Sequence, residues 1–225
     1  MTLAVSPPMS LRSLFAFAGI AVALGGCVTR SEAELGLAPL TSTVAPAVAA
    51  RYAAIDTDKY PIPGVDPSEL QPAYVRQLVP YKTNEPPGTV VVDPRQRFLY
   101  LVMEGGEALR YGVGVGKAGL EFTGSANVGR KAAWPNWTPT QGMIAREPQR
   151  YGKWAKGMSG GANNPLGPRA LYLFKDGKDT LYRIHGTTEP ETIGTAVSSG
   201  CIRMLNQDII DLYNRVPKGS KVVVK

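Results

Sequence analysis

The chain of 225 residues is 44% hydrophobic and has a net charge of +7, a size and composition that suit one ordinary globular domain with flanking segments. Residues 88–225 hold 19 Lys and Arg against 11 Asp and Glu, a net of +8. Nucleic acid is the first interpretation of such a surplus, but the charges are scattered without a basic run or basic helix, so no nucleic-acid partner is expected and a polyanionic or carboxylate-rich partner fits equally well. Two cysteines and one histidine exclude a Cys/His zinc site and a disulfide framework.

Residues 1–27 are predicted to form a lipoprotein-type signal segment. Arg12 precedes an apolar run of 11 residues at 14–24. This run is too short to span a bilayer, which takes about 20 apolar residues, but it suits the hydrophobic part of a signal peptide. The sequence LGGC that ends at Cys27 resembles a bacterial lipobox, in which Cys27 would be acylated and anchor the chain. The alternative is an ordinary signal peptide with an incidental cysteine.

Residues 28–87 are predicted to form a Pro-rich tether. Nine prolines fall between Pro39 and Pro87, and such a composition disfavours a packed core and favours an extended spacer. From Tyr60 onward apolar and aromatic residues become more frequent, so packing of this part along the domain surface is the alternative.

The pattern from Gly88 onward predicts a mainly-β domain over 88–225. Runs of β-branched, aromatic and aliphatic residues predict strands at 89–93, 97–103, 108–116, 170–174, 181–185 and 221–225. Glycine-containing turns at 104–107 and 175–178 predict two hairpins.

One helix is predicted at 206–216, with Asn206 as its N-cap and Asp208 in its first turn. Its apolar face holds Ile209, Tyr213 and Val216. The segment 117–169, between the predicted strands 108–116 and 170–174, has little periodicity and contains all three tryptophans, Trp134, Trp137 and Trp154. Long irregular segments are often binding loops or lids, so these rings either cap the core or line a cleft.

Cys201 and His185 are the candidate nucleophile and base. A free thiol with a pKa of about 8.5 is mostly protonated at neutral pH, and a neighbouring imidazole can take its proton. His185 ends a predicted strand and Cys201 lies 16 residues further on, just before the helix, so the two can converge. On spacing alone, a buried structural cysteine and a hydrogen-bonded histidine remain the alternative.

Two neighbours of Cys201 suit the same chemistry. Gly200 can bring a backbone amide close to the thiol, and with the Cys201 amide it could form an oxyanion hole. Arg203 offers a planar fork for a carboxylate. An exported thiol without a disulfide partner is also a candidate for reactivity.

The sequences RIHG at 183–186 and VSSGCIRM around Cys201 resemble the catalytic core of the L,D-transpeptidases, the YkuD-type domain of ErfK/YbiS-like lipoproteins. In that family a His-Gly on a strand precedes a Ser-His-Gly-Cys segment by this interval. Upstream, PGTVVVDPRQRFLYLV, RYGVGVGKAG, KAAWPNWT and NPLGPRALYLF resemble the family in the same order. The resemblance covers about 88–225.

The resemblance implies a peptidoglycan L,D-transpeptidase with a β-sandwich and one packed helix, without cofactor or metal, at the periplasmic face of the envelope. Cys201 would attack a diaminopimelate carbonyl of a donor tetrapeptide, expelling D-alanine and forming a thioester. His185 would activate the thiol, and the Gly186 carbonyl would orient His185. The Gly200 and Cys201 amides would form the oxyanion hole, and Arg203 would contact a substrate carboxylate.

Ser199 departs from the family pattern, because it stands where the family's Ser-His-Gly-Cys segment has histidine. It can still form a hydrogen bond near the thiol, but it cannot carry charge. The implied acceptor is the amine of another stem peptide or of an outer-membrane protein. The alternatives are an L,D-carboxypeptidase or amidase that hydrolyses the same thioester, and a lipid-anchored wall-binding module with a degenerate site.

Overall fold

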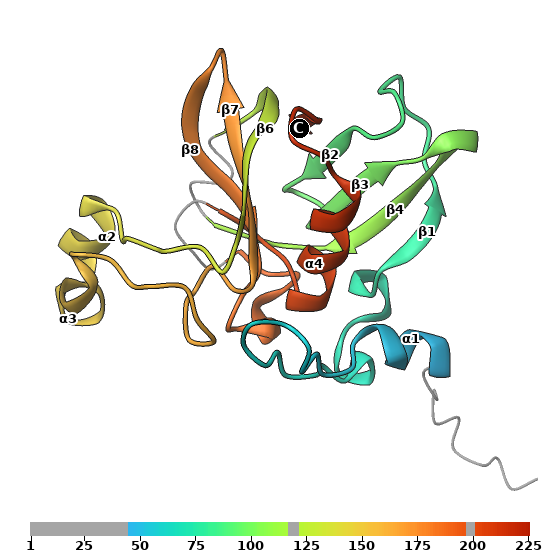
Figure 1. Cartoon of the computed structure of the whole chain (residues 1–225). Coiled ribbons are helices and arrows are strands. Elements are labelled where there is room, and N and C mark those ends of the chain that lie inside the picture. The colour runs from blue at the N-terminus through green and yellow to red at the C-terminus, as the bar shows by residue number, and fades with distance from the viewer. Residues whose placement is uncertain (1–44, 117–121, 197–200) are drawn as a thin grey trace, which may run out of the picture. The chain divides into compact units, whose positions relative to one another are not determined.

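The computed structural model describes residues 45–116, 122–196 and 201–225 of the chain (Figure 1). The predicted signal segment 1–27, with Cys27, lies outside the described residues, and so do Ser199 and Gly200. Among the described residues, none of the helices has the length and apolar content needed to cross a bilayer.

The described strands form one sheet of ten. Their bounds are β1 (Gln77–Pro80), β2 (Val90–Asp93), β3 (Phe98–Val102), β4 (Glu107–Gly112), β5 (Gly114–Val115), β6 (Gly124–Ala133), β7 (Arg169–Lys175), β8 (Lys178–His185), β9 (Ile202–Arg203) and β10 (Lys221–Val224). The order across the sheet is β1-β4-β3-β2-β10-β6-β7-β8-β9-β5. The mainly-β prediction is confirmed, and so are the two hairpins, because β3 pairs with β4 and β7 with β8, both antiparallel.

The sheet has two arms that diverge on either side of helix α4 (Asn206–Arg215), as Figure 1 shows. One arm holds β1 to β4 and the other holds β6 to β8. β10 joins them, since it pairs parallel with β2 and antiparallel with β6. The arms of the expected sandwich are therefore linked through one continuous hydrogen-bonded ladder, and the predicted helix packs between them.

The core fills the space between the arms and α4. Ile209 and Leu212 of α4 are completely buried and share one cluster with alternate valines of β2 and β10, namely Val90, Val92, Val222 and Val224. Truncating a buried residue of this kind to alanine typically costs about 2–5 kcal/mol. The core thus fixes α4, and with it the chain that enters α4 from β9.

The predicted N-cap of α4 is wrong by one residue. Leu205 is the N-cap, and Asn206 is the first helical residue. The Asn206 side chain does not cap its own helix, because its Oδ1 accepts a hydrogen bond from the Thr187 backbone N–H at 3.0 Å. Asp208 lies in the first turn, as predicted.

The remaining helical elements are short. They are α1 (Pro46–Arg51), α2 (Gln141–Arg146), α3 (Pro148–Tyr151) and the 3-10 turns η1 (Pro67–Glu69), η2 (Pro72–Tyr74), η3 (Glu104–Gly106), η5 (Gly152–Trp154) and η6 (Pro190–Thr192). In Figure 1, α2 and α3 project away from the sheet beside β8. Trp137 and Trp154 belong to this projecting part and are partly exposed. Trp134 is buried, and its Nε1–H donates to Asp58 Oδ1 at 2.7 Å.

Part of the segment expected to be a tether is folded against the domain. Tyr52 is completely buried, and its hydroxyl accepts the Arg76 backbone N–H at 2.7 Å. β1 extends the sheet by pairing with β4. The packed part begins before Tyr60, because Tyr52 shares a buried cluster with Ile193 and Leu205 of the domain.

Candidate active site

The candidate site lies where β8 and β9 run parallel. The register pairs Ile184 with Ile202 and His185 with Arg203. Since side chains alternate along a strand, the two buried isoleucines face the core and His185 and Arg203 face the opposite side. Cys201 directly precedes Ile202, so its side chain shares the face of His185 and Arg203.

Small residues leave room around this pair of strands. Ala170 of β7 is the register partner of His185, and Gly114 of β5 is the partner of Arg203. A Cβ atom on Gly114 would lie 2.8 Å from the Thr192 carbonyl oxygen and 3.2 Å from Arg203 Nη2. The position therefore requires glycine if the Arg203 guanidinium is to lie where it does.

His185 is held as a neutral imidazole. Its ring is hydrogen-bonded through Nδ1 to the Gly186 carbonyl oxygen at 2.6 Å, which requires a proton on Nδ1 and leaves Nε2 as the acceptor. The His185 carbonyl accepts the Met204 N–H at 2.8 Å, which fixes the strand end. Burial lowers the pKa of His185 to about 4, a direction that Arg203 and Arg183 reinforce and the Gly186 hydrogen bond opposes.

Cys201 is partly exposed, and its carbonyl accepts the Gly116 N–H at 3.2 Å. Burial of the thiol raises its pKa because the charged form loses solvation. Arg183 opposes this shift most, through its charge and through hydrogen bonds from its backbone and side chain, and Arg203 opposes it further.

Arg203 is a buried cation with unused donors. Its side chain is 6% exposed, and its Nη1 lies 3.4 Å from Glu189 Oε2. Its Nε and Nη2 have no hydrogen-bond partner among the described residues. Glu189 also contacts Arg150 of α3, with Oε1 3.3 Å from Nη2, so one carboxylate links Arg203 to the projecting part of the chain.

Gly186 has no room for a side chain. A Cβ atom there would overlap Asn206 Oδ1 and lie 2.9 Å from Pro168 Cδ. Asn206 cannot move freely, because its Oδ1 holds the Thr187 N–H. The absence of a side chain at Gly186 thus allows β8 to lie directly against the start of α4.

We expect Gly186→Ala to lower the free energy of unfolding by about 1–3 kcal/mol, the usual cost of overpacking, and to displace the carbonyl that holds His185. Urea denaturation and the rate of acylation at Cys201 both measure the effect. Gly161→Ala is the matched control, because a Cβ atom at Gly161 meets nothing within 4 Å. Equal stability losses in the two variants would contradict the packing argument.

The structure brings together four of the predicted site residues, Cys201, His185, Gly186 and Arg203. Ser199 and Gly200 lie outside the described residues. Sequence reasoning missed Arg183, although the alternation Arg-Ile-His on a strand places Arg183 and His185 on one face. It also missed Glu189, for which no sequence signal existed. No cluster of three or more His, Cys, Asp or Glu side chains suitable for a metal occurs among the described residues.

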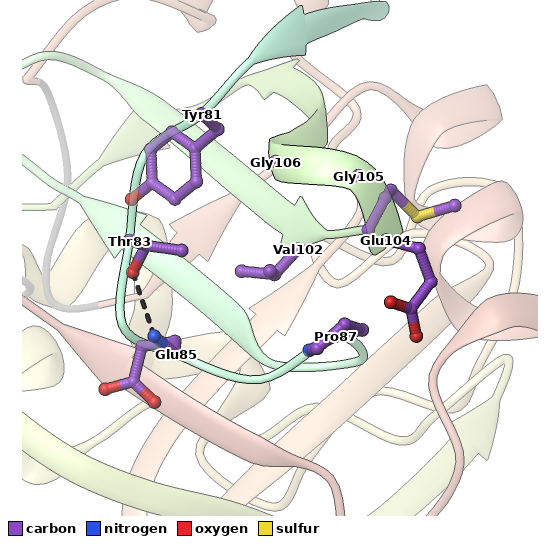
Figure 2. A pocket seen from close by; sticks show the side chains of 9 residues that line it. Tyr81, Thr83, Glu85, Pro87, Val102, Glu104, Gly105 and Gly106 are labelled. Carbon is purple, nitrogen blue, oxygen red and sulfur yellow. Dashed lines mark hydrogen bonds between the residues drawn. The ribbon is translucent and has the colours of Figure 1, made fainter.

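A separate cavity of about 200 Å³ lies on the other arm of the sheet, between the β3–β4 turn and the segment 81–87 (Figure 2). Figure 2 shows Glu85 and Glu104 at its rim, with the Glu85 N–H donating to Thr83 Oγ1 at 3.2 Å. Five strands separate β3 from β9 in the sheet order, so this cavity is not part of the candidate site.

A thiol and a neutral histidine on one face of two adjoining strands, with a buried arginine beside them, form an arrangement that suits cysteine nucleophile chemistry. Residues 87–224 match the family model of the YkuD-type L,D-transpeptidase catalytic domain. The chain belongs to this family.

Curated relatives agree with the family match. The chain is 34% identical over 137 residues to the probable L,D-transpeptidase YbiS of Escherichia coli K12, covering 60% of this chain and 43% of that protein. It is 34% identical over 167 residues to the probable L,D-transpeptidase YcfS of the same strain, covering 71% of this chain and 51% of the relative. The chain thus spans about half the length of these relatives.

Solved structures resemble the chain more loosely. A Brucella melitensis protein described as a "probable carnitine operon oxidoreductase caia" has 52% sequence identity and a TM-score of 0.49, covering 69% of this chain and 96% of its own. An L,D-transpeptidase from Mycobacterium smegmatis has 17% identity and a TM-score of 0.43, covering 61% and 58%. Because both TM-scores are below 0.5, the family assignment rests on the sequence match.

Proposed function

We propose that the chain is a peptidoglycan L,D-transpeptidase that uses Cys201 as its nucleophile. The observation that carries this proposal is the placement of Cys201 and His185 on one face of the parallel pair β8 and β9, within the matched residues 87–224. The family match supports the reaction class, and the β8–β9 register supports a nucleophile and a base on one face of the sheet.

In this reaction His185 Nε2 accepts the proton of the Cys201 thiol, and the sulfur attacks a diaminopimelate carbonyl of a donor tetrapeptide. D-Alanine leaves with a proton, and a thioester forms at Cys201. The acceptor amine then attacks the thioester, His185 takes the proton of that amine, and the new amide bond releases the thiol. A histidine with a pKa near 4 is neutral at neutral pH and can therefore act as the base.

The surrounding residues have supporting parts in the proposed reaction. The Gly186 carbonyl holds Nδ1–H of His185 at 2.6 Å and so keeps Nε2 as the acceptor. Arg203 has two buried donors without partners among the described residues, which suit a donor carboxylate. The amides of Gly200 and Cys201 are the proposed oxyanion hole.

The proposed setting is the periplasmic face of the envelope, with the chain anchored through an acylated Cys27. In the proposed organisation, 1–27 is the signal segment, 28–87 the tether and 88–225 the catalytic domain. The part of 28–87 that the structure describes packs on that domain, as β1 does. The proposed acceptor is an amine of another stem peptide or of an envelope protein.

Acylation by a carbapenem tests the nucleophile. Intact mass should show one adduct on the wild-type protein and none on Cys201→Ala, because the thioester needs the sulfur. An adduct that persists in Cys201→Ala, or no adduct on the folded wild type, would sink the assignment. Comparison of muropeptides with and without the gene then separates new crosslinks and attached proteins from hydrolysis, which would shorten stem peptides instead.

A further inference from the structure

A row of side chains crosses β6, β7 and β8 and ends at Cys201, the residue before β9. Arg130 of β6 pairs with Tyr172 of β7, and Tyr172 pairs with Arg183 of β8. The next register pair, Ile184 with Ile202, places Arg183 beside Cys201. The row therefore contains two arginines, an intervening ring and the thiol, all on the face of the sheet that carries His185.

Arg183 is held in place by several contacts. Its Nη1 donates to the Leu181 carbonyl oxygen at 2.7 Å, its Nη2 lies 3.7 Å from Asp179 Oδ2, and its Cζ lies 4.8 Å from the centre of the Tyr172 ring. The β8–β9 register places Arg183 opposite Cys201, and the charge of Arg183 counteracts the rise in the pKa of the thiol. The guanidinium is thus held on the strand next to a reacting atom of the proposed mechanism.

The backbone just before Arg183 is strained. Leu181 has a φ of +64°, a left-handed conformation that costs a residue with a Cβ atom roughly 1–2 kcal/mol. The register between β7 and β8 shifts at this point. Irregularities of this kind re-aim side chains and are frequent next to active sites. Here the strained residue supplies the carbonyl that receives the Arg183 guanidinium.

The thiol needs a cation that His185 cannot provide in the resting enzyme. With a pKa of about 4, His185 is uncharged at neutral pH. Among residues 45–116, 122–196 and 201–225, the charged groups that act on the Cys201 thiol are Arg183 from β8 and Arg203 from β9, and the adjoining strand β5 consists of Gly114 and Val115.

Of these two cations, Arg203 shares its charge with Glu189 at 3.4 Å. Arg183 pairs with Asp179 at the longer distance of 3.7 Å, and the Arg183 side chain is 24% exposed against 6% for Arg203, so solvent reaches the Arg183 guanidinium more and weakens its pairing with the carboxylate. An arginine also stays protonated at every pH at which the enzyme would act. Of the two cations that act on the thiol among the described residues, Arg183 is therefore the one less neutralised by a carboxylate.

We propose that the Arg183 guanidinium stabilises the Cys201 thiolate and orients it for attack, the part that a charged histidine takes in other cysteine enzymes. This inference rests on the proposed function of Cys201 as the nucleophile. When the thiol ionises, its proton goes to His185 Nε2, and Arg183 takes no part in the proton transfer. The ion pair between Arg183 and the sulfur is lost when the thioester forms, because the sulfur is then neutral.

The pH dependence of iodoacetamide alkylation at Cys201 tests this role, read from the mass of the peptide that contains Cys201 in the full chain. In Arg183→Gln we expect the apparent pKa of the thiol to rise by about one unit, because an adjacent opposite charge typically shifts a pKa by 1–3 units. Alkylation at pH 7 should slow about tenfold. Arg183→Lys should restore most of the rate, since lysine keeps the charge.

Arg130→Gln is the matched control, because Arg130 loses a guanidinium whose Cζ lies 3.4 Å from the centre of the same Tyr172 ring but is two strands further from the thiol. Its alkylation profile should equal that of the wild type. An unchanged profile in Arg183→Gln, or an equal shift in Arg130→Gln, would overturn the inference. Alkylation measures the reactivity of the thiol and needs no transpeptidase substrate. Failure of the proposed function, seen as the absence of a carbapenem adduct, can therefore be distinguished from failure of the inference about Arg183, seen as an unchanged alkylation profile.

Discussion

Replacing Arg76 with alanine is expected to lower the free energy of unfolding by about 3–5 kcal/mol, the usual cost of removing one partner from a buried ion pair. Arg76 Nη1 lies 2.8 Å from Asp211 Oδ2, and its Nε lies 3.6 Å from Asp208 Oδ1. Asp208 is completely buried and would lose its neighbouring cation. Urea denaturation at pH 8 measures the loss.

Arg215→Ala is the matched control for Arg76. Arg215 contacts the same carboxylate, with Nε 2.8 Å from Asp211 Oδ2, but its side chain is 46% exposed. Exposed pairs contribute only about 0–1 kcal/mol, so Arg215→Ala should change stability little. Equal losses for the two arginines would show that burial does not decide the strength of this cluster.

The loss of unfolding free energy in Arg76→Ala should also depend on pH. Burial raises the pKa of Asp208 to about 7, and Arg76 opposes that rise. Since the folded-state pKa lies above the unfolded value of 3.8, Asp208 retains its proton in the folded protein over that interval, and stability is lost as pH rises from about 4 to 7. A protonated Asp208 needs no cation, so the Arg76→Ala deficit should be smaller at pH 5 than at pH 8.

Replacing His185 with glutamine is expected to slow acylation of Cys201 by a carbapenem about 10²–10⁴-fold, the range that a positioned general base contributes. Glutamine is similar in size but cannot accept and return a proton at this point. Stopped-time intact-mass measurements give the acylation rate for the wild type and the variant. A variant that retains the wild-type rate would remove His185 from the mechanism.

The fall of the wild-type acylation rate at low pH gives a second test of His185 as the base. Because burial lowers the pKa of His185 to about 4, the imidazole stays neutral and competent down to about pH 5. The rate should fall only below that, as the ring gains a proton, whereas an exposed histidine would lose activity near pH 6.5. A limb at pH 6.5 in the wild type would contradict the burial of this base.

Local patterns predicted the elements that carry the site. The strand at 181–185, the two hairpins and the helix at 206–216 all follow from alternation, turn residues and helical periodicity, and each is present. The spacing of 16 residues also predicted that the strand ending at His185 would lie beside the chain around Cys201, and β8 does pair with β9, which begins at the residue after Cys201.

Contacts between distant parts of the chain could not be predicted from local patterns. Tyr52 is 156 residues from Asp208, yet its hydroxyl donates to that carboxylate at 3.3 Å, within a segment whose prolines indicated a tether. The capping rule placed Asn206 at the helix start but could not foresee that Thr187 would engage its side chain. The strained Leu181 that sets Arg183 depends on the β7–β8 register shift, which no spacing rule encodes.

β10 has a consequence for how the chain reaches its folded state. This strand follows the strands on both arms in the order of synthesis, and it pairs Val222 with Val90 on one arm and with Ala126 on the other. Until β10 emerges, β2 and β6 present open edges, which invite pairing with other chains. Contacts of such long sequence separation also form slowly. The two arms can therefore join into one ladder only once residues 221–224 are available to pair with both.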